Sequence, residues 1–79
     1  MKLINYQSFF RWLVSEYTAG QIKVELEFND IVYDKNFAYN SQTDSFIADS
    51  TKYPDISFGC DGKTLANYIS TGIIDLTIS

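Results

Sequence analysis

Residues 22–30 read IKVELEFND, and this stretch decides the fold. Apolar and charged side chains alternate over 22–28 without exception, which is typical of a β-strand with one buried face and one face in water. The Asn29-Asp30 pair follows, and both residue types tolerate the positive φ of a two-residue hairpin turn. We therefore expect a strand over 22–28 and a second strand that returns over 31–39.

A polar interruption, Asp34-Lys35-Asn36, divides that returning strand. Such an interruption indicates either a β-bulge or a second turn. Beyond it, apolar residues alternate again in short segments bounded by polar loops, which is the pattern of half-buried strands. Three further strands are predicted, at 45–48, 56–60 and 74–78.

A helix is expected before the first strand. Six apolar residues between Tyr6 and Tyr17 recur at helical spacing and form one continuous stripe, which predicts a helix over 6–18. Asn5 is suited to cap its N-terminus, because its side-chain oxygen can accept from an unpaired backbone amide. Gly20 is suited to end it in a left-handed conformation.

A second helix is expected over 62–70, with Asp61 as its N-cap and Gly72 at its end. The predicted element order is α-β-β-β-β-α-β, in one domain that spans 1–79. We assign it to the α+β class, as an antiparallel sheet of about four to five strands with two helices on one face.

The composition indicates a single globular domain that works inside a cell. Its 79 residues are 46% hydrophobic and 16% aromatic, which favours a dense core. No apolar run approaches the roughly 18 residues of a membrane span, and Lys2 precedes no long apolar segment of a secretory signal. One cysteine allows no internal disulfide, although small secreted domains usually contain them. Together with a composition typical of AT-rich genomes, this predicts a location in the cytoplasm of a bacterial host.

The residue types exclude several chemistries. The chain has no histidine and a net charge of −4, so it can form neither a Ser-His-Asp triad nor a Cys-His pair, and it lacks the basic patch of a nucleic-acid binder. We expect no enzyme activity, no metal, no cofactor, and no direct contact with nucleic acid or membrane. Cys60 is interpreted as a small core residue.

Gly62-Lys63-Thr64 imitates the end of a phosphate-binding loop, with a predicted strand before it and a helix after it. The motif requires a glycine five residues before Gly62, and that position is Ser57. We interpret the segment as an ordinary helix start capped by Asp61, without a bound nucleotide.

Trp12 is the first candidate for partner binding. On a helical wheel it lies roughly 130° from the centre of the apolar stripe, at about 100° per residue, so it projects beside Glu16. Tryptophan is among the residues most enriched in interface hot spots. The alternative is that the ring folds over Met1 and Leu3 or under a loop.

An acidic sheet face is the second candidate. Glu25 and Glu27 share the wet face of their strand, and three aspartates alternate with core residues of other predicted strands. The alternative is that these carboxylates serve solubility alone. The residues that we expect to contact a partner are Trp12, Glu16, Glu25, Glu27, Asp34, Asp55 and Asp75.

We therefore expect a non-catalytic protein-binding module, an acidic inhibitor of a larger protein that is basic or binds nucleic acid. Compact acidic domains are a frequent form of phage-encoded inhibitors of host defence, including anti-CRISPR proteins, but this analogy has no motif behind it. A structural or assembly subunit remains open, and so does an immunity or antitoxin protein. The subunit would form a homo-oligomer, for which the interrupted second strand offers an open edge.

Overall fold

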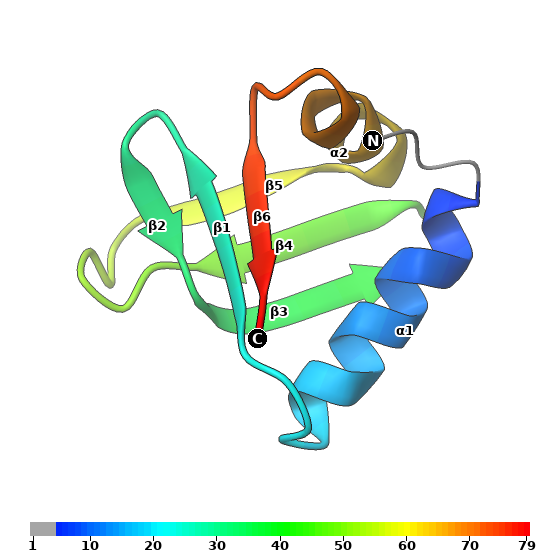
Figure 1. Ribbon diagram of the computed structural model, residues 1–79, viewed down its shortest axis with the longest axis horizontal. Helices are drawn as coiled ribbons and strands as arrows, with labels where there is room; N and C mark the ends of the chain where they lie inside the picture. Colours follow the sequence, from blue (N-terminus) through cyan, green and yellow to red (C-terminus); the bar gives the residue numbers. More distant parts are fainter. Residues whose placement is uncertain (1–4) are drawn as a thin grey trace.

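The computed structural model describes residues 5–79, and within them the chain forms two helices and six strands (Figure 1). In chain order the elements are α1 (Tyr6–Thr18), β1 (Val24–Phe28), β2 (Ile31–Tyr33), β3 (Lys35–Asn40), β4 (Ser45–Asp49), β5 (Ser57–Asp61), α2 (Gly62–Ser70) and β6 (Asp75–Ile78).

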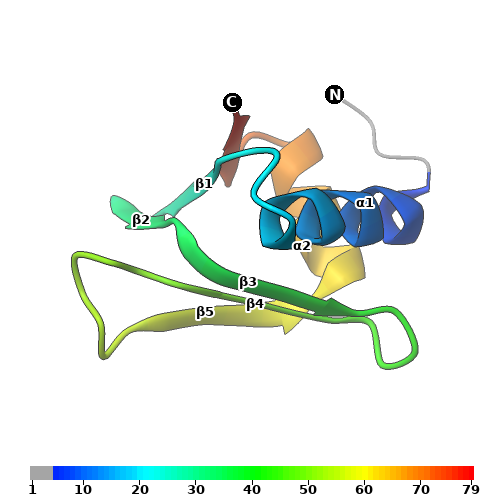
Figure 2. The same ribbon diagram turned by 90° about the horizontal axis from the view of Figure 1, so that it is seen from below.

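The strands form two separate three-stranded sheets, in which every pair is antiparallel. One has the order β2-β1-β6 and is called the β1 sheet below; the other has the order β3-β4-β5 and is called the β4 sheet. Figure 2 shows the two sheets on opposite sides of the molecule, with the helices between them at one end. Both sheets therefore turn one face toward a shared core and one face outward.

The α+β class with antiparallel strands is confirmed, whereas the single sheet is corrected to two. The chain changes sheets at the polar interruption. The amide of Asp34 already donates to the carbonyl of Asp49 (3.0 Å), so the backbone pairs with β4 from that point. Asn36 has a φ of 57°, and the β3–β4 register shifts between Lys35 and Ala38. The returning strand predicted over 31–39 thus becomes β2 and β3.

The helices also lie differently from the prediction. We expected both on one face of a single sheet, but α1 packs against β3 and α2, while α2 packs against β5 and β4. With two sheets, the helices fill the space between them, and their apolar stripes contribute to one core. Neither helix in residues 5–79 combines the length and apolar character that crossing a bilayer requires.

The predicted bounds of α1 are confirmed at both ends. The Oδ1 atom of Asn5 accepts from the amide of Ser8 (3.4 Å), which satisfies one of the unpaired donors of the first turn. Gly20 has a φ of 75°, the left-handed conformation that ends the helix.

The β1–β2 hairpin is also confirmed. Asn29 and Asp30 have φ values of 52° and 63°, as a two-residue turn with two left-handed positions requires. Leu26 is buried while Glu25 and Glu27 are exposed, so β1 has the predicted register. Because one face of β1 is apolar and the other charged, a slip by one residue would bury two carboxylates.

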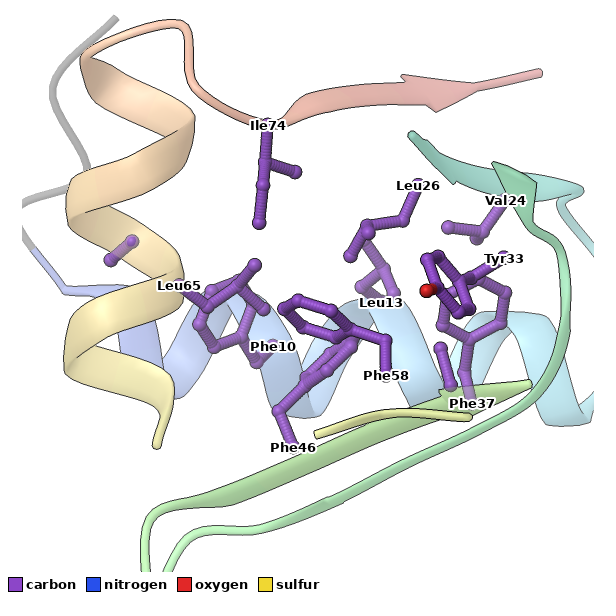
Figure 3. Close-up of a cluster of buried hydrophobic side chains, with 12 residues drawn as sticks. Phe10, Leu13, Val24, Leu26, Tyr33, Phe37, Phe46, Phe58, Leu65 and Ile74 are labelled. Carbon is purple, nitrogen blue, oxygen red and sulfur yellow. The ribbon is translucent and has the colours of Figure 1, made fainter. Parts of the chain in front are cut away.

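The core is built largely from aromatic rings and lies between the helices and both sheets (Figure 3). The rings of Phe10 and Phe46 approach to 5.4 Å between centroids and join α1 to the β4 sheet. Tyr33 and Phe58 approach to 5.6 Å and join the two sheets. Tilted aromatic pairs at these distances contribute about 0.5–1.5 kcal/mol beyond area burial, which suits a domain with a small core.

Candidate binding surface

Three of the predicted carboxylates share the outer face of the β1 sheet. Glu25 and Glu27 lie on β1, the central strand, and Asp75 lies on β6 directly opposite Glu27. All three are exposed. Side chains in directly opposite positions of an antiparallel pair have Cβ atoms about 4.5–5.5 Å apart, so Glu27 and Asp75 present neighbouring negative charges.

Asp34 extends this group beyond the end of β2. It lines the same hollow as Glu25, together with Tyr17, Ile22 and Lys23. Its Oδ1 atom accepts from the amide and the hydroxyl of Thr51, at 3.1 and 2.8 Å, so the carboxylate is held in place. The set Glu25, Glu27, Asp34 and Asp75 is called the acidic face below.

Asp55 does not join the acidic face, and the prediction that it would is wrong. It is exposed in the connection before β5, and β5 belongs to the β4 sheet. Alternation along a strand determines on which side of its own sheet a residue lies, but not to which sheet the strand belongs.

Trp12 lies on the solvent side of α1, with 46% of its surface exposed. Its ring contacts that of Phe9 at 5.8 Å between centroids and an interplanar angle of 33°. Glu16 lies one turn further along the helix and is half-buried. Met1 and Leu3, the alternative cover for the ring, are outside residues 5–79. Trp12 is therefore an exposed aromatic side chain. Its helix, α1, is separate from the β1 sheet that bears Glu25, Glu27 and Asp75 (Figure 1).

The structure also shows a polar cluster around Asp44 that sequence reasoning missed. The carboxylate of Asp44 accepts from the hydroxyls of Tyr6 (3.0 Å) and Tyr39 (2.6 Å) and from the amide of Lys63 (3.1 Å). Its backbone carbonyl accepts from the amide of Gly62 (3.0 Å). Tyr39 lies in the same β3–β4 hairpin as Asp44, but Tyr6 and Lys63 come from segments that are distant in sequence, so no local sequence signal indicates the cluster.

This Asp44 cluster joins structural elements and does not present an activated side chain. Burial and the adjacent Asp44 carboxylate raise the pKa of both Tyr6 and Tyr39, so both phenols stay protonated at neutral pH. A protonated phenol donates to the carboxylate, whereas a nucleophilic or basic tyrosine needs the opposite shift. The cluster ties α1 and β3 to the start of α2.

The segment Gly62-Lys63-Thr64, which imitates the end of a phosphate-binding loop, contacts the same cluster. Asp44 accepts from the amide of Lys63, and Asp61 Oδ1 accepts from the amide of Thr64 at 2.6 Å. A phosphate at this helix N-terminus would compete with two carboxylates for the amides that it needs. These contacts favour the interpretation as an ordinary capped helix start.

Cys60 is half-buried and packs against the core. Burial raises the pKa of its thiol to about 11, so the nucleophilic thiolate is scarce at neutral pH. Among residues 5–79, no three side chains of the types that ligate metals come together as a site. Comparison with protein-family models, with curated proteins and with solved structures finds no match for this chain.

Proposed function

We propose that this chain is a non-catalytic protein-binding module that inhibits a larger protein by docking its acidic face on a basic surface. The acidic face is the observation that carries the proposal. Three of its carboxylates project from paired strands and the fourth, Asp34, is held by Thr51. Charges fixed on such a scaffold lose little freedom on binding, which favours association.

The chemistry of the remaining polar groups supports binding rather than catalysis. The sequence contains no histidine, and the carboxylate of Asp44 is engaged by two tyrosines with raised pKa values. The hollow that Tyr17 and Glu25 line is partly open to solvent, whereas sites for small substrates enclose most of the ligand. An exposed charged face of this kind is complementary to a protein surface of opposite charge.

Within this class, the specific form that we propose is a phage-encoded inhibitor of a bacterial defence protein, acting in the cytoplasm of the host. Its support is the acidic character of the chain, with a net charge of −4 at 79 residues. Inhibition is measured by comparing the activity of the partner, at one fixed partner concentration, in the presence and in the absence of this chain. An unchanged activity of a saturated complex would reduce the proposal to binding alone.

The test of the acidic face is a kinetic comparison once a partner has been isolated by affinity capture. The double variant Glu25→Lys with Glu27→Lys should slow association and weaken its dependence on salt, because opposite charges accelerate encounter and salt screens them over about 10 Å at 0.1 M. The single variants Glu27→Lys and Asp55→Lys form the matched comparison, because each reverses one charge and Asp55 is exposed but outside the acidic face. Equal association rates for both variants would contradict the proposal.

A further inference from the structure

The acidic face borders an open sheet edge. In the β1 sheet, β6 pairs with β1 on one side, and no strand within residues 5–79 pairs with its other side (Figure 1). Edge strands present unpaired backbone groups that can pair with another chain. The edge of β6 and the carboxylate of Asp75 therefore belong to the same surface.

The hydrogen bonds identify which backbone groups point outward from β6. Lys23 and Ser79 exchange both backbone hydrogen bonds, at 2.8 and 3.0 Å. Bonded and non-bonded pairs alternate along an antiparallel ladder, so Asp75 and Thr77 direct their backbone groups toward β1. The amides and carbonyls of the residues between and after them, Leu76 and Ile78, consequently point away from the sheet.

The other three edges are less suited to adding a strand. β2 has three residues, and β3 is interrupted by the register shift after Lys35 and covered by α1. Short edges and bulges are common devices against unwanted pairing. β5 is regular, but its central residue is Gly59 and it lies in the β4 sheet, away from the acidic face. β6 alone among the four joins a regular edge to the acidic face.

We propose that an extended segment of the basic partner adds to the β1 sheet as a fourth strand, antiparallel to β6; this inference rests on the proposed function above. Main-chain hydrogen bonds to Leu76 and Ile78 provide the pairing, as in other cases of β-strand addition. The acidic face then determines which segment is accepted.

The side-chain pattern of that segment follows from its neighbours on β6. On the outer face, its residues lie beside Asp75 and Thr77, with Glu27 and Glu25 one strand further, so Lys or Arg is favoured there. On the inner face, its residues lie beside half-buried Leu76 and exposed Ile78, so apolar residues are favoured. The partner segment thus alternates basic and apolar residues. A second copy of this chain would instead place its own acidic face beside this one.

The probe is a capped seven-residue peptide that alternates lysine and valine, titrated into the isotope-labelled protein. On binding, hydrogen exchange at the amides of Leu76 and Ile78 should slow, because both amides become bonded. The matched control peptide has glutamate in place of each lysine and should not bind, because it repels the acidic face.

Two variants separate backbone pairing from side-chain contact. Ile78→Pro removes an outward amide without removing a bond to β1, and proline is tolerated at such edge positions. It should weaken peptide binding about fivefold or more, the effect of one lost hydrogen bond. Ile78→Ala keeps the amide and should bind more tightly than the proline variant. Thermal melting of both variants verifies that the fold is retained.

The outcomes distinguish this inference from the function on which it rests. If the lysine peptide perturbs Glu25 and Glu27 while exchange at Leu76 and Ile78 stays unchanged, strand addition is overturned and the acidic face remains a binding surface. Absence of any response at millimolar peptide also overturns strand addition. A concentration-dependent dimer that protects Leu76 and Ile78 without peptide would assign the edge to a second copy and overturn it as well. Failure of the proposed function appears separately, as charge-independent association with the captured partner.

Discussion

At the scale of single residues, Asp44 organises more of the fold than its place in a polar loop indicates. It stands at a left-handed φ of 53° and accepts from Tyr6 and Tyr39, on α1 and β3. It also accepts from the first two amides of α2, through its carbonyl and its carboxylate. A carboxylate at a helix N-terminus is stabilised by the local positive potential, so one residue satisfies donors from three elements.

The packing of Asp44, Tyr6 and Tyr39 leaves no room for a side chain at Gly62. A Cβ atom there would overlap Oδ1 of Asp44 and lie within 3.1 Å of the rings of both Tyr6 and Tyr39. Gly62→Ala should therefore lower the free energy of unfolding by about 1–3 kcal/mol, although alanine is the better helix former. Gly59→Ala is the control, since its Cβ would have no neighbour closer than 3.8 Å, and its effect should stay within about 0.5 kcal/mol. Urea unfolding measures both, and equal effects would refute the steric argument.

The tyrosines of the Asp44 cluster predict a loss of stability at high pH. Burial and the Asp44 carboxylate raise the folded-state pKa of Tyr6 and Tyr39 above the ordinary value of 10.0. As the pH rises past that value, the unfolded chain releases these protons first, so the free energy of unfolding decreases until the folded-state pKa is passed. Below pH 10 this contribution is fully present. Urea unfolding between pH 8 and pH 11 should show a shallower decline of the unfolding free energy for Tyr39→Phe than for the wild type. Parallel declines would show that the Asp44 cluster does not cause the loss of stability at high pH.

At the scale of elements, the sequence predicted correctly those helices and hairpins that are determined by neighbouring residues. The caps and the apolar stripe specify α1 from contiguous residues, and alternation with a two-residue turn specifies the β1–β2 hairpin. The division into two sheets depends instead on a contact between Asp34 and Asp49, which are distant in sequence. The same limit applies to the acidic face: alternation placed Glu25 and Glu27 correctly, whereas Asp55 required knowledge of the sheet to which β5 belongs.

The register of β1 gives the sharpest test of these elements. Leu26 is completely buried, and Glu27 is exposed beside it. Leu26→Ala should cost about 2–5 kcal/mol of unfolding free energy, because it removes buried methyl groups and leaves a cavity. Glu27→Ala should change the unfolding free energy by no more than about 0.5 kcal/mol. Similar losses for the two variants, measured by urea unfolding, would mean that the faces of the strand are assigned wrongly.

At the scale of the whole molecule, the fold separates two kinds of surface. The acidic face lies on the outside of the β1 sheet, and Trp12 lies on α1. Charges of this kind mainly govern the rate of encounter, because they act before contact. An exposed tryptophan that becomes desolvated mainly governs residence time, because its contacts must break before the partner leaves. The two surfaces should therefore affect different rate constants of one complex.

Trp12→Ala is the variant that tests this separation. If α1 contacts the partner, dissociation should accelerate about tenfold or more, equivalent to about 1.4 kcal/mol, while the association rate and its salt dependence stay close to wild type. Because 46% of the side chain is exposed and its ring packs against that of Phe9, which is itself only partly buried, the melting temperature should change little. Trp12→Phe is the matched variant, since it keeps an aromatic ring at the same position and should lose less residence time.

Trp12 is also the single tryptophan of the chain, so a blue shift of its fluorescence on complex formation reports desolvation directly. An unshifted emission together with wild-type dissociation of Trp12→Ala would place the whole interface on the acidic face and the edge of β6. A large drop in melting temperature would show instead that the ring supports the core through Phe9.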